Sequence, residues 1–175
     1  SSASALLKKQ SGTSTDLMFD YSVSTDKRDR RFMPTSGYYT SFSQEIPFYS
    51  DQPHIRNGFS TSHYKELNED IIGALKFRAA AVNGIGEDDV KISQRLYLGS
   101  RQLRGFEKVG PKDGSDYVGG NYSTSLNLEA NFPNFFPEKS NAEIGLFLDA
   151  GNVWGVDYND AIDDSNKIRS TFGVN

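Results

Sequence analysis

The sequence predicts an all-β fold built from about seven strands. Apolar and polar residues alternate with a period of two in several segments of about ten residues each. Aromatic residues make up 13% of the chain, with 9 Tyr and 12 Phe against 2 Met, and this balance favours pleated strands over helix bundles. The 16 glycines allow the frequent turns that such a fold needs.

Three strands are predicted in the N-terminal part of the chain. The segment DLMFDYSVS (16–24) alternates and places Leu17, Phe19, Tyr21 and Val23 on one face. A charged turn containing Pro34 and Gly37 follows, and YYTSFSQEIP (38–47) is the second strand, which we expect to end at its proline. A loop over FYSDQPHIRNG (48–58) then leads into a weaker strand, FSTSHYKELN (59–68).

The next strand precedes a long segment without regular alternation. In DIIGALKFRAAA (70–81), Leu75 and Phe77 lie opposite Lys76 and Arg78. The residues from about 84 to 121 show no sustained period, and a loop of this length inside a compact domain usually has a function or is disordered. Because this one contains several leucine and aromatic residues, we expect it to be ordered.

Two clear strands and the start of another complete the predicted set of about seven. In NYSTSLNLEANFP (121–133), Leu126 and Leu128 share one face and Glu129 lies on the other. In AEIGLFLDAGNVWG (142–155), Ile144, Leu146 and Leu148 face away from Glu143, Phe147 and Asp149. A loop rich in Asp and Asn then precedes KIRSTFGVN (167–175), which begins a strand.

Several classes of function are disfavoured by the composition. The net charge of -4 and the absence of a basic stripe argue against a nucleic-acid partner, and the lack of cysteine excludes disulfides and thiolate metal sites. The only histidines, His54 and His63, are expected at surface positions and do not make a metal site. No nucleophile motif is present, and Glu129 and Asp149 would stay ionised with Arg104 between them. We therefore assign no catalytic, cofactor-binding or metal-binding residue.

The alternation fits both a membrane β-barrel and a soluble β-sandwich that binds ligands. The polar face carries mainly Ser, Asn, Gly and Asp, as in a water-filled lumen, and the apolar face of the best strands is uncharged, as a lipid-facing band requires. Tyr and Trp near strand ends are candidates for the aromatic girdles of such a band: Tyr38, Tyr39, Tyr122 and Trp154. Composition alone leaves both folds open.

Four segments together resemble the late part of the barrel of the BamA family, the outer-membrane assembly factors of the bacterial surface-antigen superfamily. They are DKRDRRFMPTSGYYTSFSQEIP (26–47), RLYLGSRQLRGFEKVGP (95–111), GGNYSTSLNLEANFP (119–133) and GLFLDAGNVW (145–154). The Arg-Gly-Phe motif alone is common, but its order and spacing relative to the Leu-Glu and Asp-Ala-Gly strands are specific. The resemblance extends from about Thr15 to Asn175.

The resemblance implies an antiparallel, up-and-down transmembrane barrel of roughly sixteen strands behind periplasmic repeat domains. Residues 1–175 would be a partial outer-membrane barrel domain of about seven strands, with the loop of about 84–121 folded into the lumen. The periplasmic domains, the first strands and the terminal strands are expected to be absent from this chain. A paralogous translocation and assembly barrel, or an export barrel of the same superfamily, is the alternative.

The resemblance also implies a location and a set of partners. The protein would lie in the bacterial outer membrane, in contact with its lipid, and would insert nascent outer-membrane β-barrel proteins together with accessory assembly lipoproteins. It would act without enzymatic chemistry and without a cofactor.

Arg104, Gly105 and Phe106 form the loop motif that we expect to dock on the sheet. Glu129 and Asp149 lie on the polar faces of consecutive strands, so one guanidinium can bridge both carboxylates with planar hydrogen bonds. Gly105 would let the backbone approach the wall closely, and Phe106 would pack on lumen residues. The family resemblance implies the same docking of a loop arginine on strand acids. The alternative is that these are unrelated surface charges.

Overall fold

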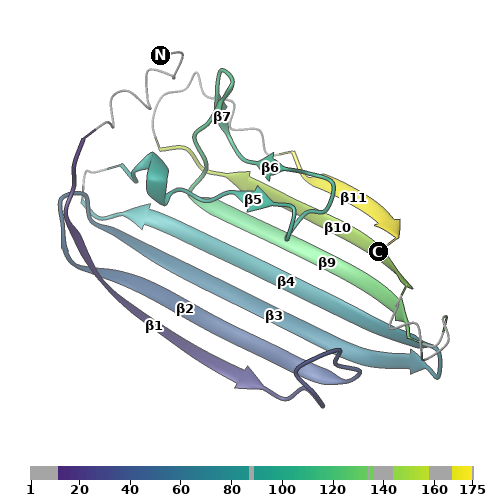
Figure 1. The fold of residues 1–175 in the computed structure, drawn as a ribbon. Coiled ribbons are helices and arrows are strands. Elements are labelled where there is room, and N and C mark those ends of the chain that lie inside the picture. Colours follow the sequence, from purple (N-terminus) through teal and green to yellow (C-terminus); the bar gives the residue numbers. More distant parts are fainter. Residues whose placement is uncertain (1–11, 87–88, 134, 136–143, 158–166, 175) are drawn as a thin grey trace.

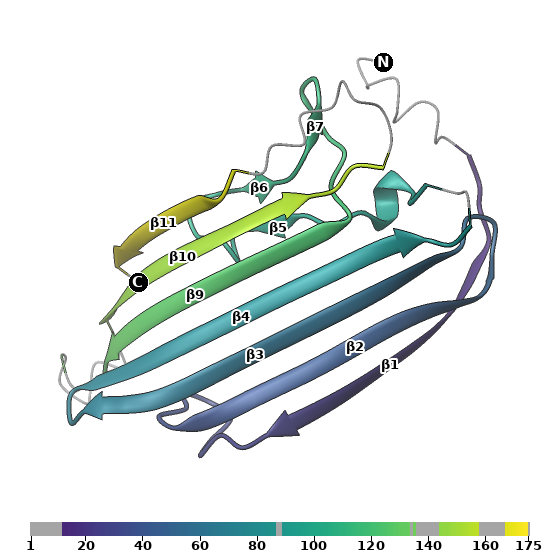
Figure 2. The ribbon, with the colours of Figure 1, turned by 180° about the vertical axis from the view of Figure 1, so that it is seen from behind.

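A computed structural model describes residues 12–86, 89–133, 135, 144–157 and 167–174. Seven strands form one antiparallel sheet in the order β1-β2-β3-β4-β9-β10-β11, so each strand pairs with its neighbours in the up-and-down sequence (Figures 1 and 2). The strands are β1 (Asp16–Asp26), β2 (Gly37–Ser50), β3 (His54–Asn68), β4 (Ile71–Gly84), β9 (Tyr122–Phe132), β10 (Ile144–Trp154) and β11 (Arg169–Val174). The predicted all-β, antiparallel fold of about seven strands is confirmed. None of the helical residues that the structure describes belongs to a helix long and apolar enough to cross a membrane.

On β4, β9 and β10 the apolar face of the sheet is exposed and the polar face of β9 and β10 is buried, which is the reverse of a soluble protein. Leu75, Leu128 and Leu148 lie side by side on β4, β9 and β10 and are 38–46% exposed. On the opposite face, Asn127 is 3% exposed and Asp149 is fully buried. A sandwich would cover the leucines with a second sheet, whereas the described residues pack nothing against them. The soluble-sandwich alternative is therefore wrong.

The boundary expected between the second and third strands is also wrong. β2 continues past Pro47 to Ser50, because the register with β1 shifts there: Leu17 pairs with Tyr49 and Met18 with Pro47. The extra residue, Phe48, forms a β-bulge, a position where a strand tolerates proline.

β3 begins at His54, so the connection is only residues 51–53 rather than the expected loop over 48–58. The polar side chains of this stretch, which obscured its strand character, pair across the sheet. Gln44 donates a 2.6 Å hydrogen bond to Asn57, and Arg56 lies opposite Glu45.

The two histidines have different environments. His54 is 2% exposed, and its Nε2 lies 3.0 Å from a Glu45 carboxylate oxygen, so the expected surface position is wrong for this residue. His63 lies on the apolar face, where it stacks on Tyr38.

The aromatic residues near strand ends divide between the two faces. Tyr122 and Trp154 stack on each other at one end of the apolar face, with ring centroids 5.9 Å apart. Tyr39 lies on the polar face under the Arg28 guanidinium and opposite Ser62, so it cannot belong to a lipid-facing girdle. Side chains alternate between the two faces of a strand, so the consecutive residues Tyr38 and Tyr39 lie on opposite faces.

The segment between β4 and β9 folds into short elements across the polar face of β9 and β10 (Figure 1), with the sheet in front of it when seen from behind (Figure 2). They are the 3-10 helix η1 (Ile92–Gln94) and the two-residue strands β5 (Leu98–Gly99), β6 (Lys108–Val109), β7 (Lys112–Asp113) and β8 (Asp116–Tyr117). A small core holds this loop together and includes one residue of β10: Leu98, Leu103, Val109 and Val153, with Phe106 packed against them. The loop thus covers the polar face of β9 and β10 (Figure 1).

Candidate functional site

Arg104 attaches the loop to the sheet through Asp149 of β10. The guanidinium donates two parallel hydrogen bonds to the carboxylate, from Nε at 2.8 Å and from Nη2 at 2.7 Å. The backbone N–H of Arg104 donates a third bond at 3.0 Å, and Asn127 Nδ2 donates a fourth at 2.8 Å. Four donors therefore compensate for the removal of this fully buried carboxylate from water.

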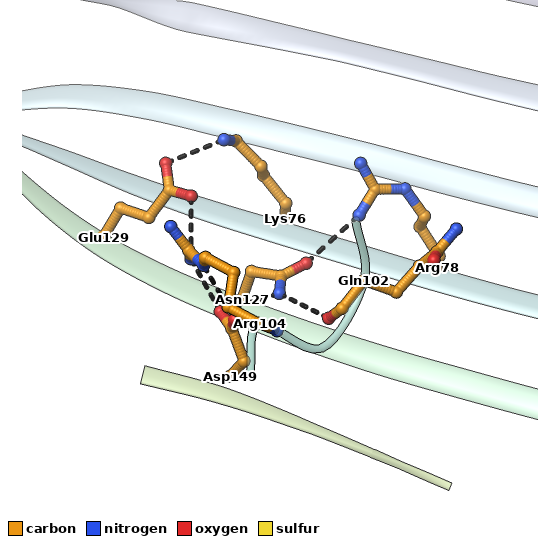
Figure 3. A network of polar contacts seen from close by, with 7 residues as sticks. All are labelled: Lys76, Arg78, Gln102, Arg104, Asn127, Glu129 and Asp149. Atoms are coloured by element: carbon orange, nitrogen blue, oxygen red, sulfur yellow. Dashed lines mark hydrogen bonds and ion pairs between the residues drawn. The ribbon is translucent and has the colours of Figure 1, made fainter. Parts of the chain in front are cut away.

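Glu129 of β9 completes the contact (Figure 3). Its Oε1 lies 3.0 Å from Arg104 Nη2, and its Oε2 accepts a 2.7 Å hydrogen bond from Lys76 Nζ on β4. Two cations and two carboxylates thus alternate across three strands and the loop, so the charges of this cluster balance. The structure brings together Arg104, Glu129 and Asp149, the three charged residues that the sequence singled out.

The sequence interpretation missed the aromatic partner of Arg104. The Arg104 Cζ lies 3.8 Å from the centroid of the Phe147 ring, within the range of a cation–π contact. Phe147 pairs with Glu129 across the ladder and therefore lies on the polar face. The sequence did contain a signal for this partner, because the alternation of β10 places the large ring of Phe147 on the polar face. The guanidinium is fixed by a ring beneath it and by carboxylates at its edge.

Gly105 and Phe106 shape the loop beside this contact. Gly105 has a φ of +84°, a conformation that side chains disfavour, and a Cβ there would lie 3.6 Å from the Thr171 Oγ1 of β11. Phe106 packs against the small core that three loop residues form with Val153 of the sheet. Gly105 thus supplies the positive-φ turn directly after Arg104, and Phe106 joins the small core of the loop.

A second arginine, this one buried, holds the entrance of the loop. Arg95, 3% exposed, donates to the backbone oxygen of Val90 at 3.1 Å and to Asn121 Oδ1 at 2.8 Å, and it pairs with Asp157 after β10. Asn121 also donates to Asp157 at 3.0 Å. Burial acts to raise the pKa of Asp157, but the hydrogen bonds from Arg95 and Asn121 outweigh it and hold the pKa below its usual value. The sequence signal was an arginine at the start of the otherwise apolar run RLYL.

The cluster of Lys76, Arg104, Glu129 and Asp149 has the chemistry of a structural contact, and we call it the clamp. Every charged group in it pairs with an opposite charge, and Asp149, held by four donors, can act only as an acceptor. Among the residues that the structure describes, no three His, Asp or Glu side chains gather in a way that could hold a metal ion. What the arrangement can do is fix the loop to the polar face.

An antiparallel sheet with an exposed apolar face, and a polar face covered by its own loop, is the wall of a transmembrane β-barrel. The family model described as the Omp85 superfamily domain matches residues 1–175. The chain therefore belongs to the Omp85 superfamily.

The names of several similar proteins refer to assembly. The chain is 26% identical over 175 residues to the outer membrane protein assembly factor BamA of Neorickettsia risticii, covering 96% of this chain and 23% of that protein. It is 28% identical over 167 residues to the human sorting and assembly machinery component 50 homolog, covering 89% and 35%. The crystal structure of BamA from Haemophilus ducreyi lacking POTRA domains 1–3 matches with a TM-score of 0.80 and 26% identity, over 92% of this chain and 36% of that one. The chain thus spans about a quarter to a third of the length of these relatives.

Proposed function

We propose that this chain is part of the barrel wall of an outer-membrane protein assembly factor, and that the loop over about 84–121 lies in the barrel lumen. The observation that carries the proposal is the inverted burial: the polar residues of β9 and β10 lie under the loop, and the leucines of the same strands are open. In a membrane barrel the open leucines contact lipid, so the loop occupies the water-filled side.

In this proposal the Arg104 cluster connects the loop to the barrel wall and stiffens it, so that it acts as a brace. Arg104 connects the loop to β9 and β10 at once through Glu129 and Asp149, and Lys76 extends the connection to β4. Four chain segments therefore share one network, and the loop resists inward bending of these three strands. In an assembly factor, such bracing keeps this part of the wall closed, while nascent strands pair with exposed strand edges elsewhere in the barrel.

The partners follow from the same role. Nascent outer-membrane β-barrel proteins are the substrates, membrane lipid contacts the apolar face, and accessory assembly lipoproteins are further partners. The work is strand pairing, so the protein is not an enzyme and uses no cofactor. The relatives named BamA favour the bacterial outer membrane. The relatives named as components of the sorting and assembly machinery support a second candidate, the mitochondrial outer membrane.

The proposal is tested with the full-length parent protein in lipid vesicles. A radiolabelled, urea-unfolded outer-membrane barrel protein is added, and its folding is followed by its heat-modifiable migration on gels. We expect folding to be faster than in protein-free vesicles, and slower with Arg104→Ala than with wild type. Equal folding rates in wild-type and empty vesicles would contradict the assembly function. Equal rates for wild type and Arg104→Ala would contradict only the role of the brace.

A further inference from the structure

A cavity of about 260 Å³ lies between the loop and the polar face of the sheet, outside the Arg104 cluster. We call it the serine slot. Leu96, Tyr97, Leu98 and Gln102 of the loop form one side of it. Residues of β2, β3, β4 and β9 form the other side. Besides Phe59 and Ala79, they make two rows of cross-strand neighbours: Ser41, Ser60, Arg78 and Ser125 in one row, and Ser43, Gly58, Ala80 and Ser123 in the other.

The side chains of the slot leave hydrogen-bonding capacity unused. The hydroxyl of Ser125 is buried, with the residue 1% exposed, and has no hydrogen-bond partner among the described protein atoms. Ser41 and Ser60 bond to each other at 2.9 Å, which uses the proton of one hydroxyl and leaves the other available. A Cβ on Gly58 would lie 2.7 Å from Ser43 Oγ, so glycine keeps this hydroxyl uncovered. An unpaired buried hydroxyl costs free energy that a bound acceptor recovers.

The charge of the slot favours an anion. Among the described residues that line it, Arg78 is the only charged one and none carries a carboxylate. The Arg78 Nη1 donates to the neutral Asn127 amide at 3.1 Å (Figure 3), and within the described residues its guanidinium has no acid partner. The nearby acids, Glu129 and Asp149, are already neutralised by Lys76 and Arg104. Arg78 pairs in register with Ser60 on one side and with the unpaired Ser125 on the other.

We infer that the serine slot binds a phosphate-sized oxyanion, held by Arg78 and by the hydroxyls beside it. A guanidinium with adjacent hydroxyl donors is a typical set of partners for an oxyanion. The cavity is several times larger than the roughly 30 Å³ of one water molecule, so the anion enters with part of its hydration shell. Two sources share this chemistry: free inorganic phosphate, and the phosphate of a lipid headgroup. The inference does not depend on the proposed assembly function.

The test titrates inorganic phosphate into the full-length parent protein in a non-ionic detergent, by isothermal calorimetry at constant ionic strength. We expect saturable binding by wild type and binding weaker by about tenfold or more in Arg78→Gln and in Ser125→Ala. Matched controls are Ser62→Ala, on the polar face of β3 outside the slot, and Arg30→Gln in the turn after β1; both should bind as wild type does.

A second titrant separates the two sources. Dihexanoyl phosphatidylglycerol below its micellar concentration is titrated into the same four variants and the wild type. Slot-dependent binding of phosphate alone identifies a free anion, and slot-dependent binding of the lipid alone identifies a headgroup; either outcome supports the inference. If neither titrant binds, or if the slot variants bind as the controls do, the slot holds water only and the inference is wrong. Ser125→Ala removes only a hydroxyl, so the test stands even if Arg78→Gln does not fold.

Discussion

Replacing Arg104 by alanine in the full-length protein should release the middle of the loop from the sheet. The change removes the contacts of the guanidinium with Asp149, Glu129 and the Phe147 ring. Breaking a buried ion pair costs about 3 to 5 kcal/mol. The lower value applies because the Arg104 side chain is 27% exposed and Asp149 keeps its hydrogen bond from Asn127 of the sheet. About 3 kcal/mol corresponds to roughly a 100-fold increase in the open population of the loop.

Hydrogen exchange of the loop amides measures this opening. The readout is the exchange rate of the amides between Leu98 and Phe106, which should increase by roughly 100-fold in Arg104→Ala, while amides in β3 stay unchanged. Arg101→Ala is the matched control, because Arg101 lies in the same loop with an exposed side chain. Loop amides that exchange within about threefold of wild type in Arg104→Ala would refute the account of the clamp.

Three further predictions concern the attachment and the conformation of the same loop. Asp149→Asn should destabilise the loop more than Glu129→Gln does. The first change removes the bidentate pair with Arg104, whereas the second removes a single 3.0 Å contact with the loop, since the other partner of Glu129 is Lys76 of the sheet. Pulse proteolysis measures both, and the reverse order would contradict the assignment. Gly105→Ala should lower the free energy of unfolding by about 1 to 2 kcal/mol. The φ of +84° alone causes this loss, because a Cβ has room there. An unchanged denaturant midpoint would show that the loop accommodates the alanine without strain. The pKa of Asp157 is depressed in the folded protein, so its stabilisation is present above its ordinary pKa of about 3.9 and is lost as the pH falls through the folded value. Pepsin cleavage of the loop should therefore rise as the pH falls below about 4 in wild type, and Asp157→Asn should lack this added acid sensitivity.

The sequence predicted the sheet well where apolar residues alternate strictly. Leu126 and Leu128 define β9 with little ambiguity, because only a period of two places both on one face and Glu129 on the other. Prediction failed at the end of β2 and the start of β3, where Pro47, Gln44 and Asn57 interrupt the apolar pattern. A bulge accommodates the proline, and the two polar side chains form a hydrogen bond with each other. Both features depend on a neighbouring strand, so the sequence of one strand alone does not predict them.

The site was partly predictable for a related reason. Alternation fixes the face on which Glu129 and Asp149 lie, and two acids on one confined face need a cation such as Arg104. The partners that depend on the path of the loop were missed. Arg95 meets Asp157 because the loop entrance passes the end of β10, and no local pattern encodes that contact.

The most direct test of the central claim measures which face of the sheet contacts lipid. The chain contains no cysteine, so single nitroxide labels can be placed at Phe77 and Ala80 of β4 in the full-length protein in vesicles, provided that any cysteine elsewhere in the parent is removed first. These residues lie on opposite faces, Phe77 beside Leu126 and Ala80 beside Ser123 under the loop. The account predicts that the label at Phe77 is relaxed mainly by lipid-soluble oxygen and that the label at Ala80 is protected from it. Greater oxygen access at Ala80 than at Phe77 would contradict the account.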